Sequence, residues 1–180
     1  MIDKNKTENK GSAPRVILGI DPGTGRVGWA VLDLVVQEKK LGKGKEMVLK
    51  DYGCLETVVN TPLPERLEYI YKEVNRLIAK FKPNELAIEE LFFVKNIKTG
   101  MSVAHARGVV ILAAKQNKLK IFEYKPNEIK LSIAGYGHAT KDQIRRMLKL
   151  HLKGCNIKQD DAADAVAVAL CHLSRPKIYQ

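Results

Sequence analysis

The sequence has few cysteines and no long apolar run, and each shortage excludes a class of protein. Only Cys54, Cys155 and Cys171 are present, without Cys-x-x-Cys spacing. This argues against a disulfide framework or a zinc site and favours a reducing cytoplasm. No apolar run is as long as the roughly 18 residues that a membrane-spanning helix needs. The polar N-terminus also lacks the apolar stretch of a signal peptide. A chain of 180 residues is therefore expected to form one globular domain.

Negative charge is scarce in one third of the chain. Residues 91–157 carry 13 basic and 3 acidic side chains, whereas residues 1–90 carry 15 and 14 and residues 158–180 carry 3 and 3. Nearly all of the net charge of +11 therefore lies in one segment. Such a concentration favours binding to a nucleic acid, because Lys and Arg release the counterions condensed on phosphates. The alternative is a solvated basic surface that keeps the protein soluble.

Hydrophobic patterning predicts three strands, followed by helices that alternate with two further strands. This order is typical of an α/β sheet with an antiparallel half and a parallel half. Residues 1–14 are polar and Lys-rich and predict a disordered basic tail, and the domain is expected over 15–180. The predicted strands are 15–20, 26–36, 47–59, 85–90 and 119–124, with a loop at 37–45. The predicted helices are 61–81, 99–116, 126–133, 141–152 and 160–174.

Acidic residues interrupt apolar segments at three places. Asp21 ends the first predicted strand, Glu89 or Glu90 ends the fourth, and Asp161 and Asp164 lie three residues apart near the start of the last helix. A spacing of three places both aspartates on one helix face. Carboxylates that converge raise one another's pKa unless a cation offsets their repulsion. Oxygen-only ligation favours Mg²⁺ or Mn²⁺, and two such ions about 3.5–4 Å apart can hydrolyse a phosphodiester.

A plainer interpretation of the same acidic residues stays open at this point. Asp161 and Asp164 could stabilise a helix N-terminus through its dipole. Asp21 could be an ordinary turn residue before Pro-Gly. Spacing along the sequence does not show that the three segments meet.

Five segments in colinear order between about residues 15 and 174 resemble the RuvC family of bacterial Holliday-junction resolvases. The set is specific as a whole, whereas GIDPG alone would be weak. The segments are GIDPGTGRVGWAV (19–31), LAIEELFFVKN (86–96), AHARGV (104–109), FEYKPNEIKLSIAGYGHATK (122–141) and DDAADAVAVAL (160–170). The resemblance implies an RNase H-like fold and a homodimer that nicks two opposed strands of a four-way DNA junction. It also implies two Mg²⁺ ions in each active site, with Mn²⁺ able to substitute.

The family's four catalytic and metal-binding acidic positions fall on Asp21, Glu89, Asp161 and Asp164. Glu89 matches the catalytic glutamate because it directly follows the Ala-Ile pair. Glu90 falls where the family has no catalytic residue, and strand alternation points it to the opposite face.

The family's DNA-contacting positions fall on Phe92, Lys130 and Lys141. Phe92 matches an aromatic that inserts at the junction centre, where stacking on a base supplies about 1–3 kcal/mol. Core packing is the alternative for this side chain. The two lysines are expected to hold phosphates. The resemblance further implies partnership with the RuvA and RuvB branch-migration proteins and a place at the nucleoid in the bacterial cytoplasm.

Three other functions are weighed against this one. A YqgF-type RNase H-like nuclease for ribosomal RNA precursors shares a DPG-like opening, but it matches the AIEELFF and DDAADA segments less well. A phosphate-binding domain of the sugar-kinase kind needs two such domains, for which the chain is too short. A non-catalytic junction-binding protein would have a decayed site, whereas all four acidic positions are filled here.

Overall fold

Five segments form one mixed β-sheet in the computed structural model, which describes residues 15–39, 42–91, 97–152 and 155–175. The strands are β1 (Arg15–Asp21), β2 (Arg26–Lys39), β3 (Gly42–Glu56), β4 (Glu85–Glu89) and β5 (Lys120–Tyr124). Their order across the sheet is β3-β2-β1-β4-β5. β1, β2 and β3 pair antiparallel, while β1, β4 and β5 pair parallel. The predicted mixed sheet is confirmed.

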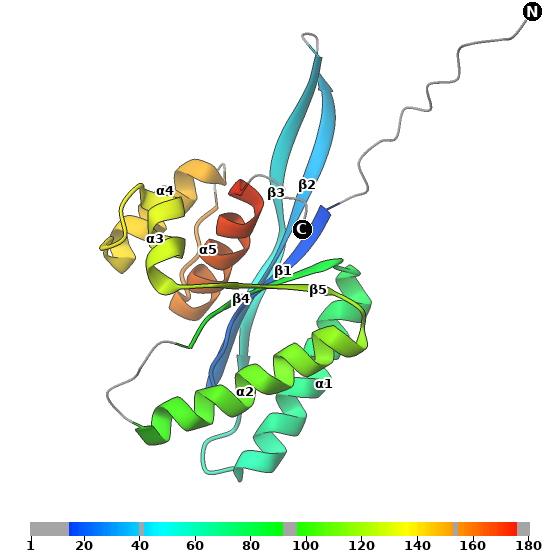
Figure 1. Ribbon diagram of the computed structural model, residues 1–180, viewed down its shortest axis with the longest axis vertical. Helices are drawn as coiled ribbons and strands as arrows, with labels where there is room; N and C mark the ends of the chain where they lie inside the picture. The colour runs from blue at the N-terminus through cyan, green and yellow to red at the C-terminus, as the bar shows by residue number, and fades with distance from the viewer. Residues whose placement is uncertain (1–14, 40–41, 92–96, 153–154, 176–180) are drawn as a thin grey trace, which may run out of the picture.

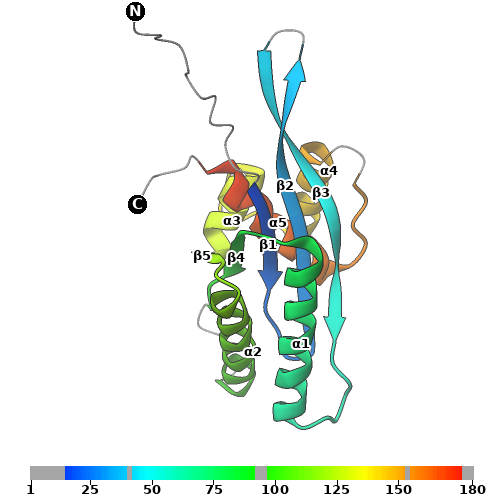
Figure 2. The same cartoon turned by 90° about the vertical axis from the view of Figure 1, so that its right-hand side faces the viewer.

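Helices cover both faces of the sheet (Figures 1 and 2). α1 and α2 pack on one face, and α3, α4 and α5 pack on the other. Their bounds are α1 (Leu63–Phe81), α2 (Ile97–Gln116), α3 (Pro126–Ala134), α4 (Lys141–His151) and α5 (Asp160–Ser174). In the part of the chain that the structure describes, no helix is long and apolar enough to cross a membrane. The predictions for the tail 1–14 and for Phe92 lie outside the described residues.

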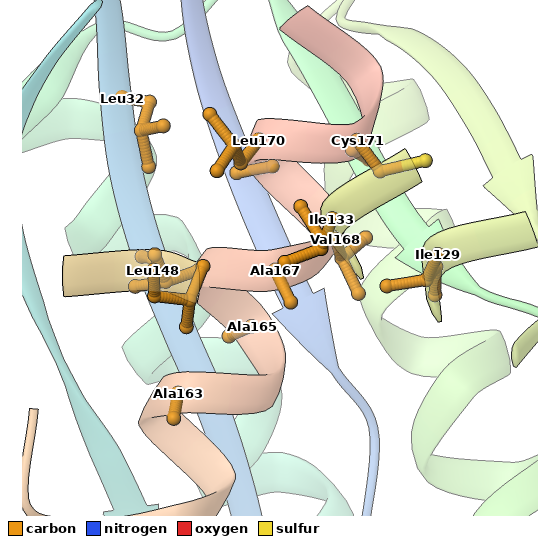
Figure 3. Packing of buried hydrophobic residues seen from close by; sticks show 14 of the residues in the cluster. Leu32, Ile129, Ile133, Leu148, Ala163, Ala165, Ala167, Val168, Leu170 and Cys171 are labelled. Atoms are coloured by element: carbon orange, nitrogen blue, oxygen red, sulfur yellow. The ribbon is translucent and has the colours of Figure 1, made fainter. Parts of the chain in front are cut away.

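Strand alternation divides the buried residues between two cores. Ile17 of β1 and Ala87 of β4 pack with α3, α4 and α5, whereas their neighbours Leu18 and Ile88 pack with α1 and α2. Successive side chains of a strand point to opposite faces, so a central strand that is apolar throughout is buried on both sides. Figure 3 shows the first core, in which the small side chains of α5 face the sheet and the neighbouring helices.

The loop predicted at 37–45 is wrong for most of its length. β2 continues to Lys39 and β3 begins at Gly42, with Val36 opposite Lys45 and Gln37 opposite Gly44. The two strands form a long hairpin that extends past the helices (Figure 1). Beyond the helical layers a ladder needs no apolar face, so its residues can be charged. Charge and glycine content were therefore misleading signals here.

Two glycines let α5 lie directly on the sheet. A Cβ built on Gly19 would lie 2.5 Å from the main-chain oxygen of Ala165 and 2.6 Å from the Cβ of Ala169. A Cβ on Gly28 would overlap the main-chain oxygen of Asp161. Glycine inside a strand commonly marks such a close approach of another backbone. The first turn of α5 is therefore placed by the bare backbone of β2.

We predict that Gly28→Ala destabilises the protein by about 1–3 kcal/mol, because the added methyl group forces α5 or β2 to move. Urea unfolding should show a lower midpoint with an unchanged slope. The matched control is Gly137→Ala, since the nearest atom to a Cβ there lies at an ordinary 3.5 Å. Equal stability of the two variants would contradict the close approach.

Candidate active site

Asp21 and Glu89 lie side by side at the carboxyl ends of two parallel strands. Ile20 of β1 is opposite Ile88 of β4, so the next residues along each strand are neighbours. Alternation from Ile17, which packs on the α5 side, places Asp21 on that same face. Glu89 follows Ala87 in the same way. The predicted choice of Glu89 over the following glutamate agrees with this alternation.

α5 brings the other two predicted carboxylates to this edge. Asp161 lies in its first turn, and Asp164 follows three residues later. The main-chain oxygen of Asp161 lies against Gly28, which pairs with Asp21 across β1 and β2. Negative side chains near a helix N-terminus interact favourably with its dipole, which offsets part of their mutual repulsion.

The opposite end of α5 is anchored by a buried polar cluster. Nε2 of His172 lies 2.7 Å from Oε2 of Glu85, which also accepts a 2.7 Å hydrogen bond from Nε of Arg15. Tyr124 contacts the other ring nitrogen of His172. Burial favours a higher pKa for Glu85, but the hydrogen bonds from His172 and Arg15 outweigh it and lower that pKa to about 2. These contacts fix the far end of α5 on β1 and β4.

The four predicted carboxylates form one electrostatic cluster. Burial, together with the charges of the other three carboxylates, raises the pKa of Asp21 to about 8, and the charge of Lys141 opposes this rise. Burial and the charge of Asp164 also raise the pKa of Glu89, whereas a hydrogen bond with Asp21 lowers it. Such a hydrogen bond requires one proton between two carboxylates. The protein therefore reduces the repulsion among these carboxylates by keeping a proton on Asp21.

Both predicted lysines also reach this cluster. Nζ of Lys141 lies 3.1 Å from Oδ2 of Asp164, and this hydrogen bond raises the pKa of Lys141. Lys130 lowers the pKa of Glu89 through its positive charge. The two lysines, Glu89 and Asp164 line a single cavity of about 210 Å³ between α3, α4 and α5. This cavity places positive groups beside the carboxylates, where an anionic phosphate would need them.

Two further side chains at the site were not predicted. Sγ of Cys54 lies 3.9 Å from Oδ2 of Asp161, and Nη1 of Arg26 lies 3.9 Å from the same oxygen. Cys54 is opposite Gly28 in the sheet register. The register of β2 with β3 places Cys54 at the site, and the sequence alone does not reveal that register.

A larger cavity, of about 360 Å³, lies elsewhere, between α4, residues 155–158 and the start of α5. It contains none of the predicted carboxylates. Its lining is rich in cations, with Arg145, Arg146, Lys149 and Lys158 beside Asp142. We take the smaller cavity as the candidate active site because the carboxylates with raised pKa lie there or next to it.

The donor set of the cluster fits a hard divalent cation. All four side chains offer carboxylate oxygens, which Mg²⁺ and Mn²⁺ prefer, and buried like charges need a counter-ion. Among the described residues, no three Asp, Glu, His or Cys side chains are close enough together to hold one ion as they stand. In this arrangement the ammonium group of Lys141 forms an ion pair with Asp164. A cation would therefore draw the carboxylates together and compete with this ammonium group.

This chain is similar to known proteins over most of its length. The family model described as "Crossover junction endodeoxyribonuclease RuvC" matches residues 17–172. The chain belongs to the RuvC family. The protein of this name from Brachyspira hyodysenteriae is 47% identical to it over 164 residues, which are 91% of this chain and 97% of that protein. The Finegoldia magna protein of the same name is 46% identical over 158 residues, 87% of this chain and 92% of the relative.

Solved RuvC structures share the fold. The structure of Thermus thermophilus RuvC in complex with Holliday junction substrate has a TM-score of 0.78 and is 29% identical. The match covers 88% of the present chain and 93% of the Thermus chain. A yeast mitochondrial Holliday junction resolvase has a TM-score of 0.59 at 12% identity and covers 89% of this chain and 79% of its own. The yeast likeness concerns the fold alone. The predicted RNase H-like fold is confirmed by the RuvC structures.

Asp21 should make the metal-free protein less stable as the pH rises. Its pKa is about 8 in the folded protein, against an ordinary value of 3.8. The folded state thus holds a proton that the unfolded state releases, so this contribution is present below about pH 4 and is lost as the pH rises to about 8. We predict that Asp21→Asn stabilises the metal-free protein at pH 8, by about 0.5–2 kcal/mol.

Thermal unfolding in EDTA between pH 5 and pH 9 measures this effect. The advantage of Asp21→Asn over the wild type should grow with pH. A matched Asp33→Asn variant of β2, which lies away from the cluster and is paired with Lys50, should show no such growth. A variant at Asp21 that is less stable than the wild type at every pH would contradict the buried repulsion.

Proposed function

We propose that this chain is a structure-selective endodeoxyribonuclease that resolves Holliday junctions by paired, symmetric nicks in recombination and DNA repair. The observation that carries the proposal is the convergence of Asp21 and Glu89 with two acidic residues of α5 in a chain of the RuvC family. The two lysines beside them supply the positive charge that a DNA phosphate needs. The nuclease domain would comprise residues 15–180.

Asp21, Glu89, Asp161 and Asp164 would hold the metal, and we propose two Mg²⁺ ions, with Mn²⁺ as a substitute. Such ions supply Lewis acidity to the attacking water and to the leaving oxygen of a phosphodiester. The chain's own part is to keep the four carboxylates at one edge of the sheet, and a bound cation would displace the proton that Asp21 holds. The donor chemistry and the raised pKa of Asp21 support this assignment.

Lys130 and Lys141 would bind the scissile phosphate. Preorganised cations beside a reacting phosphate stabilise the charge that develops in the transition state. When a cation takes Asp164, the ammonium group of Lys141 becomes available to the DNA. The basic cavity along α4 and the rest of the positive segment would contact the DNA arms, and Phe92 would stack on a base at the junction centre.

We further propose that the protein acts as a homodimer through α2. One face of this helix packs on the core with Ala106 and Val110, both fully buried. The opposite face exposes Met101 by 58% and Leu112 by 52%, and a Cβ on Gly108 between them would meet open space. We propose that a second copy of the chain packs against these exposed apolar residues. Two sites related by a two-fold axis suit a junction of near two-fold symmetry.

The family membership favours this function over the alternatives. A YqgF-type nuclease acting on ribosomal RNA precursors, and a junction-binding protein without activity, would each need a different match or a depleted acidic cluster. We also propose that the RuvA and RuvB proteins are partners and that the protein works at the nucleoid of the bacterial cytoplasm.

Nicking of a synthetic mobile four-way junction tests the function. We predict paired, symmetric nicks in the presence of Mg²⁺, none in EDTA, and none on a linear duplex or an RNA duplex of the same sequence. Asp21→Asn should reduce the nicking rate by at least about 10³-fold, because a metal ligand is lost, while junction binding is retained. Equal cutting of the linear duplex or of RNA would refute the junction specificity.

Disruption of the exposed α2 face tests the dimer. Leu112→Glu should convert a dimer into a folded monomer, because burying an unpaired carboxylate at an apolar interface is costly. Sedimentation equilibrium measures the mass, and unpaired nicks should replace paired ones. The control is Val59→Glu, which also replaces an exposed apolar residue but lies in the segment before α1. A wild-type monomer bound to the junction would contradict this assembly.

A further inference from the structure

Arg107 of α2 joins that helix to the end of β4. Its Nε donates a 3.2 Å hydrogen bond to the main-chain oxygen of Glu89, the residue whose side chain belongs to the acidic cluster. Its guanidinium also forms an ion pair with Glu123 of β5. One side chain therefore links α2 to both β4 and β5 at the edge of the sheet where the candidate active site lies.

The main-chain carbonyl group of Glu89 lies at the end of β4 and is held by a side chain of another element. β4 ends at this residue. The next main-chain amide, that of Glu90, donates to the oxygen of Tyr124 on β5 at 2.8 Å, so β5 holds the chain on the amide side. Arg107 holds the adjacent carbonyl from α2. The peptide that carries the Glu89 side chain is thus fixed between two neighbours.

Arg107 is itself held firmly. Its side chain is only 18% exposed, and burial lowers its pKa, while the charge of Glu90 acts in the opposite direction. A largely buried guanidinium needs hydrogen-bond partners, and here Nε donates to Glu89 and Nη2 donates to Glu123. The neighbouring Ala106 is fully buried in the core. The guanidinium therefore acts as a rigid support.

We infer that Arg107 is a positioning residue for Glu89, which sets the backbone from which this carboxylate reaches a metal ion. The inference deepens the proposed function and rests on it. Arg107 touches neither the metal nor the DNA in this account. Groups that orient metal ligands from behind typically contribute 10- to 100-fold, roughly, to metal affinity or activity.

The test compares Arg107→Gln with the wild type in single-turnover nicking of a four-way junction. The rate should fall about 10- to 100-fold and the Mg²⁺ concentration for half-maximal rate should rise. The junction Kd measured in Ca²⁺ should stay within about threefold, because no DNA contact is removed. A second readout needs no cleavage: the rise in melting temperature caused by Mg²⁺ should be smaller in the variant than in the wild type.

Three variants separate positioning from general stability. Arg107→Lys retains the charge and should recover part of the Mg²⁺ response. Glu123→Gln removes the ion pair but keeps the hydrogen bond to Glu89, so its rate should stay close to that of the wild type. Arg76→Gln, which removes an exposed arginine paired with Glu73 on α1, should match the wild type.

The outcomes distinguish the two proposals. A wild type that binds Mg²⁺ but does not nick junctions would refute the proposed function, and the Mg²⁺-induced shift in melting temperature would still decide the role of Arg107. An Arg107→Gln variant with wild-type nicking and a wild-type Mg²⁺ response would overturn the inference. So would an equal loss in Glu123→Gln, since the ion pair and not the carbonyl contact would then be responsible.

Discussion

The close contact between α5 and the bare backbone of β1 and β2 is the constraint on which the site depends. Gly19 and Gly28 leave no room for a side chain at that contact. Because α5 lies so near the sheet, its first residues reach the strand ends that carry Asp21 and Glu89. A larger residue at either glycine would lift the helix and separate the carboxylates from one another.

That constraint works against stability at the acidic end. The cluster holds several negative groups in a partly buried place, and Asp21 keeps its proton until about pH 8 as a result. The far end of α5 compensates, where His172, Glu85 and Arg15 form a satisfied buried cluster. Contacts at the far end of α5 therefore stabilise the helix on the sheet, while repulsion among the carboxylates destabilises its first turns.

Local patterns in the sequence predict much of this structure. Asp21 and Glu89 are recognisable because each ends a short apolar segment, and the bounds 160–174 predicted for the last helix are those observed for α5. Lys141 and Lys130 were assigned through the family resemblance, and the structure places both beside the cluster. Their roles, and those of the carboxylates, stay proposals.

What the sequence could not predict depends on distant pairing. The extension of β2 and β3 arises from a ladder between charged segments, which hydrophobic patterning does not detect. Cys54 and Arg26 meet Asp161 only because of the register of β2 with β3 and the placement of α5. The sequence shows Arg107 only as part of the AHARGV segment. Its role could not be predicted, because its contact with the Glu89 carbonyl depends on how α2 packs against the end of β4.

The central claim is that the acidic cluster is a divalent metal site, and anomalous diffraction from crystals soaked in Mn²⁺ tests it most directly. The account predicts anomalous peaks among Asp21, Glu89, Asp161 and Asp164, with Lys141 moved off Asp164. The absence of any peak among these carboxylates at a Mn²⁺ concentration that supports nicking would contradict it.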